Sequence, residues 1–197
     1  MEPLAVGLHA AIQSGVKLGD TVVILGAGCI GLTTLLACRA MSASRIIVTD
    51  LYENRLRKAK ELGADEVLDG SVDILEKIME LTDGKGADIV FETAGSRVTA
   101  MQTEQLTKRG GLIMVVGNVM GETPMNFYKM IKKELSLKTV FRYRNAFPLA
   151  IQAVADGRIR LKALATDIFA FDDAVEAFEK ARTKKEEVVK VVLKLGE

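Results

Sequence analysis

Short apolar runs of strand length alternate along the chain with longer segments of helical periodicity. This alternation is typical of parallel strands joined by helices, because strands covered on both faces are apolar at nearly every position. We expect six strands, at residues 21–25, 45–49, 65–68, 87–92, 112–116 and about 136–141. Helices are expected at residues 2–14, 29–41, 53–62, 72–81, 97–107 and after Pro124. The pattern predicts an α/β fold with a doubly wound, six-stranded parallel sheet.

The rhythm changes after residue 144, and we expect a C-terminal tail of helices and one strand. Its expected elements are a helix at 145–156, an apolar run at 163–169, and a helix from a cap at Asp172-Asp173 to about residue 182. The last apolar run, at 188–195, is a strand candidate. A strand needs a sheet, so this one cannot stay isolated. The chain is therefore divided into residues 1–144 and residues 145–197.

The first expected strand ends in a glycine turn, Gly26-Ala27-Gly28-Cys29-Ile30-Gly31. Gly26 permits a tight turn, Gly28 lets a pyrophosphate approach the backbone, and Gly31 lets the next helix pack close to the strand. The start of that helix offers free N–H groups and a positive dipole end to a phosphate. These features predict a dinucleotide-binding Rossmann domain with strand order 3-2-1-4-5-6.

An acid follows the glycine turn at the distance that such a site requires. Asp50 lies 19 residues after Gly31, at the end of the second expected strand. Its carboxylate can accept hydrogen bonds from the adenosine ribose hydroxyls, and it would repel a 2′-phosphate. The sequence therefore favours NAD over NADP. The alternative interpretation is a surface acid that caps the next helix.

Charge and cysteine content narrow the setting. The 197 residues carry 27 basic and 26 acidic side chains, a net charge of +1 that gives no electrostatic basis for binding nucleic acid or an anionic membrane. No apolar run approaches the roughly 20 residues of a membrane span, and we expect no signal peptide. Cys29 and Cys38 fall on one expected helix, where they cannot form a disulfide, so we expect a cytoplasmic location.

Two other features of the sequence are candidates for catalytic or metal-binding chemistry. His9 is the single histidine, and no Cys/His spacing resembles a zinc cluster, so we interpret His9 as a packing or surface residue and expect no metal site in this chain. Tyr128 and Lys132 have the Tyr-x-x-x-Lys spacing of short-chain dehydrogenases. The glycine turn is not of that type, and the segment is typical of an amphipathic helix, so we reject this interpretation.

Several stretches together resemble the cofactor half of zinc-dependent medium-chain alcohol and polyol dehydrogenases, most closely the sorbitol (L-iditol, xylitol) dehydrogenase branch. They are Glu2 to Ala10, Gly26 to Gly31, Val48 to Leu51, Arg55-Leu56, Ala59 to Asp65, Glu92 to Gly95, and Val140 to Tyr143 with Asn145. The resemblance implies a parent enzyme that transfers a hydride from a secondary alcohol of a polyol to NAD, with zinc polarising the alkoxide. Threonine and butanediol dehydrogenases stay open as alternatives, and the polyol cannot be named.

The resemblance also implies roles for individual residues on the cofactor side. Asp50 would hold the ribose, and Arg55 would lie beside the adenine, although a solvated Arg55 paired with Glu53 or Asp50 is an equal alternative. Cys29 stands where the family usually has proline, which leaves its backbone amide available. The pyrophosphate would be held by Gly26, Gly28 and Gly31 with the amides of Cys29 and Ile30. The nicotinamide side would be bordered by Thr93, Val116, Gly117 and the segment from Val140 through Phe141 to Arg142.

On the catalytic side, the resemblance implies that Arg142 and Tyr143 lie near the substrate and that Glu2 is an acid beside the catalytic zinc. Family members carry their zinc ligands in a separate N-terminal domain, and this chain starts at the Glu-Pro that follows it. We therefore expect a cofactor-binding half without catalytic activity of its own, with zinc confined to the full-length parent. An NAD-binding module without any catalysis is the alternative hypothesis.

The expected partners follow from the same resemblance. The substrate would be a small-molecule polyol, with no nucleic acid and no membrane involved. Because the family pairs cofactor domains across a two-fold axis, we expect a homodimer or homotetramer. The contact would involve residues around 112–118 and 135–141, and the unpartnered strand at 188–195 offers a second route to association.

Overall fold

The computed structural model describes residues 1–196, and its centre is a six-stranded parallel sheet. The strand order is β3-β2-β1-β4-β5-β6, which confirms the predicted order and fold class. The inner strands β1, β2 and β4 are buried at nearly every position, as apolar runs covered on both faces should be. The strands are β1 (Thr21–Leu25), β2 (Arg45–Asp50), β3 (Glu66–Asp69), β4 (Ala87–Glu92), β5 (Thr107–Val115) and β6 (Ser136–Thr139).

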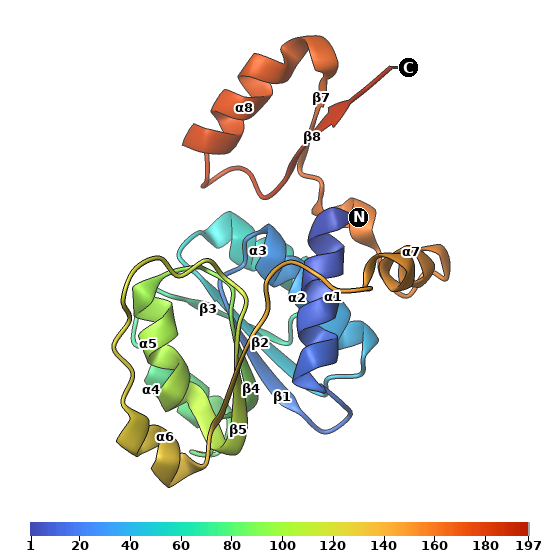
Figure 1. Cartoon of the computed structure of the whole chain (residues 1–197). Helices are drawn as coiled ribbons and strands as arrows, with labels where there is room; N and C mark the ends of the chain where they lie inside the picture. The colour runs from blue at the N-terminus through green and yellow to red at the C-terminus, as the bar shows by residue number, and fades with distance from the viewer. Residues whose placement is uncertain (197) are drawn as a thin grey trace.

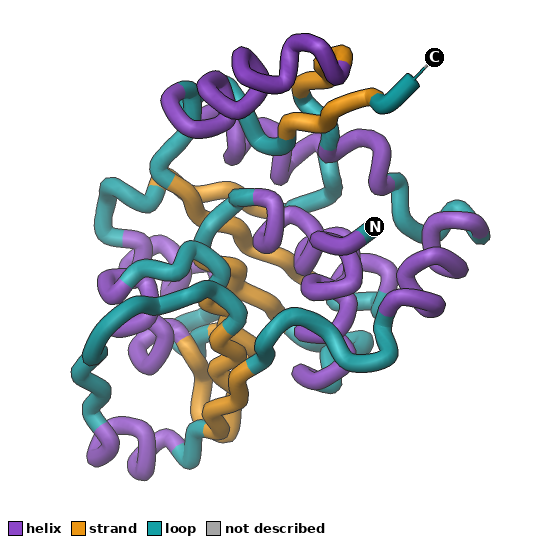
Figure 2. Tube along the Cα trace, turned by 45° about the horizontal axis from the view of Figure 1, so that its top comes forward, coloured by secondary structure: helices purple, strands orange, loops and turns teal. Residues whose placement is uncertain are grey.

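Helices cover both faces of the sheet (Figure 1). One face packs against α1 (Glu2–Ser14), α2 (Cys29–Ala40), α3 (Glu53–Glu61) and α7 (Phe147–Ala155), and the other against α4 (Ile74–Leu81) and α5 (Arg97–Leu106). Alternate residues of β1 divide between the two cores, with Val22 and Ile24 in one and Val23 and Leu25 in the other. The tube view shows the same sandwich of helices around the strands (Figure 2).

Two strand boundaries differ from those predicted by more than one residue. β5 begins at Thr107, which pairs with Ala87 ahead of a register shift, and only then does Leu112 pair with Ile89. The apolar run from residue 112 marks only the part of β5 after this irregularity, because the earlier residues pair through their backbone and are partly exposed. β6 ends at Thr139 rather than at residue 141. The helix α6 (Phe127–Lys133) precedes β6 in the chain. It follows Asn126, whose side chain accepts a hydrogen bond from the Lys129 amide.

The C-terminal strand β8 (Val191–Lys194) has a partner, so the prediction that it would be unpaired is wrong. It runs parallel to β7 (Asp167–Ala170), and the connection between them contains η2 (Phe171–Asp173) and α8 (Ala174–Thr183). Sequence periodicity could not show this pairing, because β7 is only four residues long and half exposed. Asp173 stands at the N-cap of α8, but its side chain makes no capping hydrogen bond, contrary to expectation.

The small unit of β7, α8 and β8 projects from the end of the sheet at which α1 begins (Figure 1). Before it, α7 and η1 (Leu161–Leu164) continue the first core, since Ala146, Ala150 and Leu164 belong to the same apolar cluster as β1. The division at residue 144 stays a prediction. None of the helices within residues 1–196 combines the length and the apolar character needed to cross a bilayer.

Candidate dinucleotide-binding site

In the glycine turn between β1 and α2, Gly26 and Gly31 are tightly packed, whereas Gly28 borders open space. Gly26 has a φ of +102°, and its amide donates a hydrogen bond to the Thr49 carbonyl at 2.8 Å. A methyl group on Gly31 would lie only 1.8 Å from the Gly26 carbonyl oxygen. A methyl group on Gly28 would have Arg55 Nη1 as its nearest neighbour, at 4.0 Å. The turn is therefore packed tightly against the helix, while the space above Gly28 stays free for a ligand.

Asp50 lies against this turn. Its Oδ2 accepts a hydrogen bond from the Ala27 amide at 2.7 Å, and its Oδ1 accepts one from the Tyr52 amide at 3.0 Å. The Asp50 side chain is only 8% exposed. The carboxylate is thus fixed at the carboxyl end of β2 by two backbone donors, between the glycine turn and the start of α3.

Arg55, in the first half of α3, brings a positive charge to the same place. Its Nη1 lies 3.9 Å from Asp50 Oδ2, and its guanidinium lies 4.9 Å from the centre of the Tyr52 ring. Its Nε is buried and has no hydrogen-bond partner among residues 1–196. Because it also faces Gly28, Arg55 can reach both an adenosine and a phosphate.

A cavity of about 410 Å³ opens between these groups and the loop that follows β4. It lies where the strand order reverses between β1 and β4, which is the usual ligand site of such sheets, and its volume is typical of ligand pockets. Its lining combines the glycine turn, the end of β2 and the start of α5: Gly26, Gly28, Thr49, Asp50, Leu51, Tyr52, Arg55, Gly70, Ile74, Thr93, Ala94, Ser96, Val98, Thr99 and Gln102.

The residues expected on the nicotinamide side lie at the carboxyl ends of β4 and β5. Thr93 Oγ1 lies 2.9 Å from the carbonyl oxygens of both Leu25 and Gly26, so it links β4 to the glycine turn. The Gly117 amide donates to the Glu92 carbonyl, and Val116 packs partly buried against the core. The structure thus brings Thr93 beside the turn and places Val116 and Gly117 at the end of the neighbouring strand β5.

The residues expected near the substrate lie outside this cavity. Glu2 is exposed in the first turn of α1. Phe141, which the resemblance assigns to the nicotinamide side, is 76% exposed, and the Arg142 guanidinium lies 5.3 Å from the centre of its ring. Tyr143 is partly buried against Phe147, with ring centres 5.2 Å apart. Their proposed roles rest on the family resemblance.

Sequence reasoning missed Lys190, which precedes β8. A second cavity of about 560 Å³ is lined by Cys29 and Arg55 on one side, and by Lys190 and residues of α8 and β8 on the other. Burial raises the pKa of the Cys29 thiol, and the positive charge of Lys190 opposes that rise. The structure therefore places a second cation opposite the start of α2. No sequence spacing marks Lys190, because its position depends on how the tail folds back.

The described residues do not fit a zinc ion. Within residues 1–196 there is no group of three or more His, Cys, Asp or Glu side chains arranged to hold a metal. His9 lies in α1 with 9% of its surface exposed. Burial lowers its pKa below the usual 6.5, and the charge of Arg144 adds to this effect. No catalytic step through zinc is therefore assigned to these residues.

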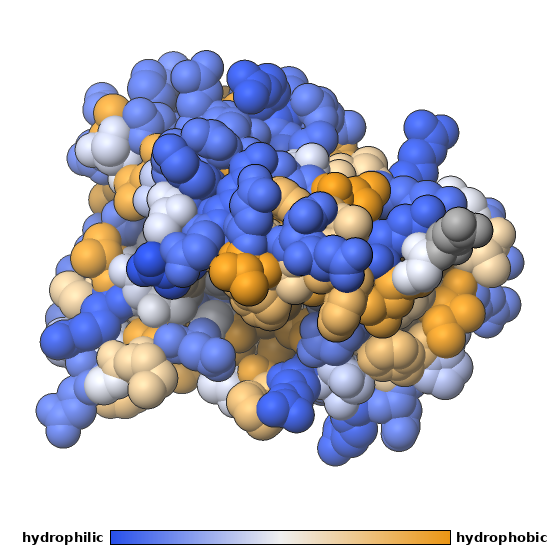
Figure 3. Space-filling view, turned by 90° about the horizontal axis from the view of Figure 1, so that it is seen from above, coloured by the Kyte–Doolittle hydropathy of each residue, from blue (hydrophilic) through white to orange (hydrophobic). Residues whose placement is uncertain are grey.

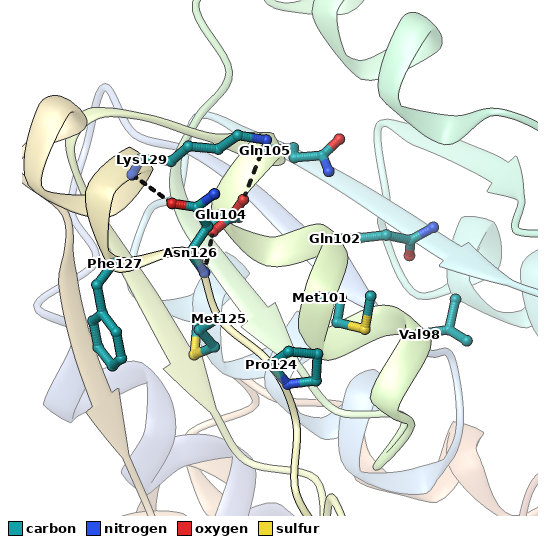
Figure 4. Close-up of a pocket in the computed structure, with 10 residues that line it drawn as sticks. All are labelled: Val98, Met101, Gln102, Glu104, Gln105, Pro124, Met125, Asn126, Phe127 and Lys129. Carbon is teal, nitrogen blue, oxygen red and sulfur yellow. Dashed lines mark hydrogen bonds and ion pairs between the residues drawn. The ribbon is translucent and has the colours of Figure 1, made fainter.

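Another cavity, of about 690 Å³, lies away from the glycine turn, between α5 and the segment before α6 (Figure 4). Met101, Pro124 and Met125 form its apolar side, while Glu104 accepts a hydrogen bond from the Asn126 amide at 3.1 Å. On α6, Lys132 Nζ lies 4.6 Å from the centre of the Tyr128 ring. Neither member of this pair lines the cavity at the glycine turn.

The strand order, the glycine turn and the acid at the end of β2 together define a Rossmann-type α/β domain. Residues 29–156 match the family model described as zinc-binding dehydrogenase, so the chain belongs to the zinc-binding dehydrogenase family. This confirms the resemblance to the cofactor half of the medium-chain dehydrogenases.

Individual relatives agree with this assignment. The chain is 46% identical to an uncharacterized zinc-type alcohol dehydrogenase-like protein of Escherichia coli K12, over 100% of this chain and 57% of that protein. It is 38% identical to human sorbitol dehydrogenase, over 98% and 55% respectively. An alcohol dehydrogenase from Escherichia coli CFT073, solved in complex with NADH, superposes with a TM-score of 0.92 at 25% identity, over 98% of this chain and 58% of that one. The chain thus spans about half the length of the relatives it matches.

Proposed function

We propose that this chain binds NAD(H) at the carboxyl ends of its parallel strands, as the cofactor-binding part of a polyol dehydrogenase. The observation that carries this proposal is the hydrogen bond from the Ala27 amide to Asp50 beside the 410 Å³ cavity. It fixes a carboxylate next to the open space above Gly28. Ribose hydroxyls and a pyrophosphate require these two features side by side.

The pyrophosphate would lie above Gly28, at the start of α2, where the amides of Cys29 and Ile30 have no partner within the helix. Arg55 and Lys190 would add positive charge on either side of it. Asp50 would accept hydrogen bonds from the adenosine ribose and exclude a 2′-phosphate, which favours NAD over NADP. When bound, the nicotinamide supplies the hydride acceptor, and the protein binds and orients it.

We propose a polyol as the substrate of the assembled enzyme, because the relatives include sorbitol dehydrogenases. In that enzyme Arg142 and Tyr143 would contact the substrate, and Glu2 would lie beside the catalytic zinc. The described residues contain no cluster that fits zinc, so we expect the chain by itself to be inactive. NAD-dependent oxidation of sorbitol by the purified chain, with and without added zinc, tests this point, and sustained turnover would contradict it.

We also propose that the chain forms a homodimer, with a homotetramer as the larger alternative. β6 is one of the two edge strands of the sheet, and all four of its residues are exposed. Leu137 on β6 and Phe127 and Ile131 on α6 add apolar side chains to this edge. An exposed edge strand with apolar neighbours favours pairing with a second copy. β5 is covered by β6, so the expected contact around 135–141 carries this proposal rather than 112–118.

The unit of β7, α8 and β8 presents a second apolar surface, which we propose packs against a catalytic domain. Figure 3 views the molecule from this end and shows apolar residues gathered around a hollow. The exposed apolar side chains of this unit are Ile168, Phe171, Val175, Phe178, Val192 and Leu195. Surfaces of this kind usually mark an interface.

Both cysteines are free thiols, which favours the reducing cytoplasm as the location.

A fluorescence titration of the purified chain with NADH tests the proposed function. We expect saturable binding with one NADH per chain and competition by NAD. The Gly28→Ala variant serves as the control, because its methyl group would occupy the space assigned to the pyrophosphate. The same signal from wild type and Gly28→Ala would contradict the proposed site.

A further inference from the structure

Glu92, the last residue of β4, is a fully buried acid with 0% of its surface exposed. Its Oε1 accepts hydrogen bonds from the Gly95 amide at 2.9 Å, the Ser96 amide at 3.4 Å and the Thr99 hydroxyl at 2.7 Å. A carboxylate in the interior needs such donors, because burial of an unpaired polar group is costly. All three donors belong to the loop after β4 and the first turn of α5.

The other oxygen of Glu92 faces β5. Oε2 is buried without a hydrogen-bond partner among residues 1–196, and a methyl group on Gly117 would come within 2.5 Å of it. The Glu92 carbonyl accepts hydrogen bonds from the amides of Val116 and Gly117. Glu92 therefore joins the ends of β4 and β5 to the start of α5 through one residue.

The groups that Glu92 holds form one wall of the cavity at the glycine turn. Ser96 and Thr99 line this cavity directly, as do Asp50 and Arg55. Thr93, the next residue along the chain, lies within 2.9 Å of the Gly26 carbonyl oxygen. Glu92 itself does not line the cavity, so it can act on a ligand only through these neighbours.

We propose that Glu92 is a positioning residue for the dinucleotide. Its carboxylate holds Gly95, Ser96 and Thr99 in the geometry that closes the adenosine side of the cavity. This inference rests on the proposed function, because it presupposes a dinucleotide in that cavity. It assigns Glu92 no contact with the ligand and no part in hydride transfer.

The test compares Glu92→Leu, which removes all three acceptor contacts, with Glu92→Gln, which keeps an acceptor oxygen and nearly the same size. We expect Glu92→Leu to bind both NADH and ADP-ribose at least about tenfold more weakly, because the affected wall faces the adenosine half. Glu92→Gln should restore affinity to within about threefold of wild type. Hydrogen exchange of the Gly95 and Ser96 amides in the free protein should accelerate in Glu92→Leu and stay slow in Glu92→Gln.

Thr103→Val is the control for a merely structural effect. Thr103 is 1% exposed on α5, its hydroxyl donates to the Ala100 carbonyl, and it does not line the cavity. We expect this variant to lower thermal stability without changing affinity or exchange at Gly95 and Ser96. If Glu92→Leu does not fold, Thr99→Val removes one of the three donors instead, and we expect it to weaken NADH and ADP-ribose binding and to accelerate exchange of the Gly95 and Ser96 amides.

Three outcomes would overturn the inference or its foundation. Wild-type affinity and exchange in Glu92→Leu would refute the role of Glu92 while leaving the proposed function intact. Equal losses of affinity in Glu92→Leu and Thr103→Val would reduce Glu92 to a stability residue. A wild-type chain that binds neither NADH nor ADP-ribose would refute the proposed function, and with it a cofactor role for Glu92.

Discussion

The backbone amide of Ala27 donates a hydrogen bond of 2.7 Å to the Asp50 carboxylate, across 23 residues of sequence. The bond joins the glycine turn after β1 to the end of β2. It turns an acid that could have been a surface residue into part of the wall of a cavity. A ribose binding there would meet a carboxylate that is already oriented, which reduces the entropic cost of binding.

Replacement of Asp50 by asparagine should weaken NADH binding by about 10- to 100-fold, because hydrogen bonds to a charged group contribute about 1.5–3 kcal/mol. Affinity for NADPH should fall less or rise, since the repulsion of a 2′-phosphate is removed. Asp65→Asn is the matched control. Like Asp50, Asp65 accepts a hydrogen bond from a backbone amide, in this case that of Ile46 in β2. Asp65 lies outside the cavity. Equal losses of NADH affinity in the two variants, measured by calorimetry, would contradict the role of Asp50.

Alanine substitutions at two glycines of the turn should have different effects, one on NADH binding and the other on folding. A methyl group at Gly28 meets nothing closer than 4.0 Å, so Gly28→Ala should keep the wild-type melting temperature and lose NADH binding. A methyl group at Gly31 would overlap the Gly26 carbonyl oxygen, so Gly31→Ala should be strongly destabilised. Thermal melts and NADH titrations of both variants check this. Full NADH affinity in Gly28→Ala would show that the ligand does not cross the turn.

His9 should titrate below its usual pKa of 6.5, because burial first and the charge of Arg144 second disfavour the imidazolium. Since the unfolded chain binds that proton more readily, the free energy of unfolding should fall as the pH drops from about 6.5 towards the lowered folded-state pKa. His9 is the single histidine, so one imidazole resonance in an NMR pH titration reports it. A midpoint above 6.5 would contradict the burial argument.

The edge of the sheet should control assembly. Leu137 is 42% exposed on β6, and Leu137→Lys should shift a dimer to monomer with little change in thermal stability. Leu18→Lys is the control, because Leu18 is 78% exposed on the turn before β1 and is not part of β6. Light scattering after size-exclusion chromatography measures both. A dimer that persists in Leu137→Lys, or wild-type chain that is monomeric at high concentration, would refute pairing through β6.

Much of the fold could be predicted from the sequence, because buried parallel strands are continuous apolar runs. β1 and β4 have the predicted ends, and the glycine turn lies where the motif places it. The start of β5 was missed because Thr107 joins the sheet before the register shift, without an apolar run. The pairing of β7 with β8 was missed because short, half-exposed strands give little hydrophobic signal.

Some residues of the candidate site could also be predicted from the sequence, and others could not. Gly26, Gly28, Gly31 and Asp50 form a local motif with fixed spacing, and a single sequence suffices to propose them. Lys190 and Glu92 depend on tertiary structure. Lys190 comes near Cys29 only when the tail folds back, and the role of Glu92 becomes visible only through its burial and its three donors.

We propose that the cavity beside Ala27 and Asp50 binds NAD(H) in preference to NADP(H). Calorimetric titration of the wild-type chain with NADH and with NADPH, under the same conditions, tests it most directly. We predict saturable one-to-one binding of NADH and binding of NADPH that is at least about tenfold weaker. Equal affinity for the two, or tighter binding of NADPH, would contradict the role of Asp50, and binding of neither would contradict the site itself.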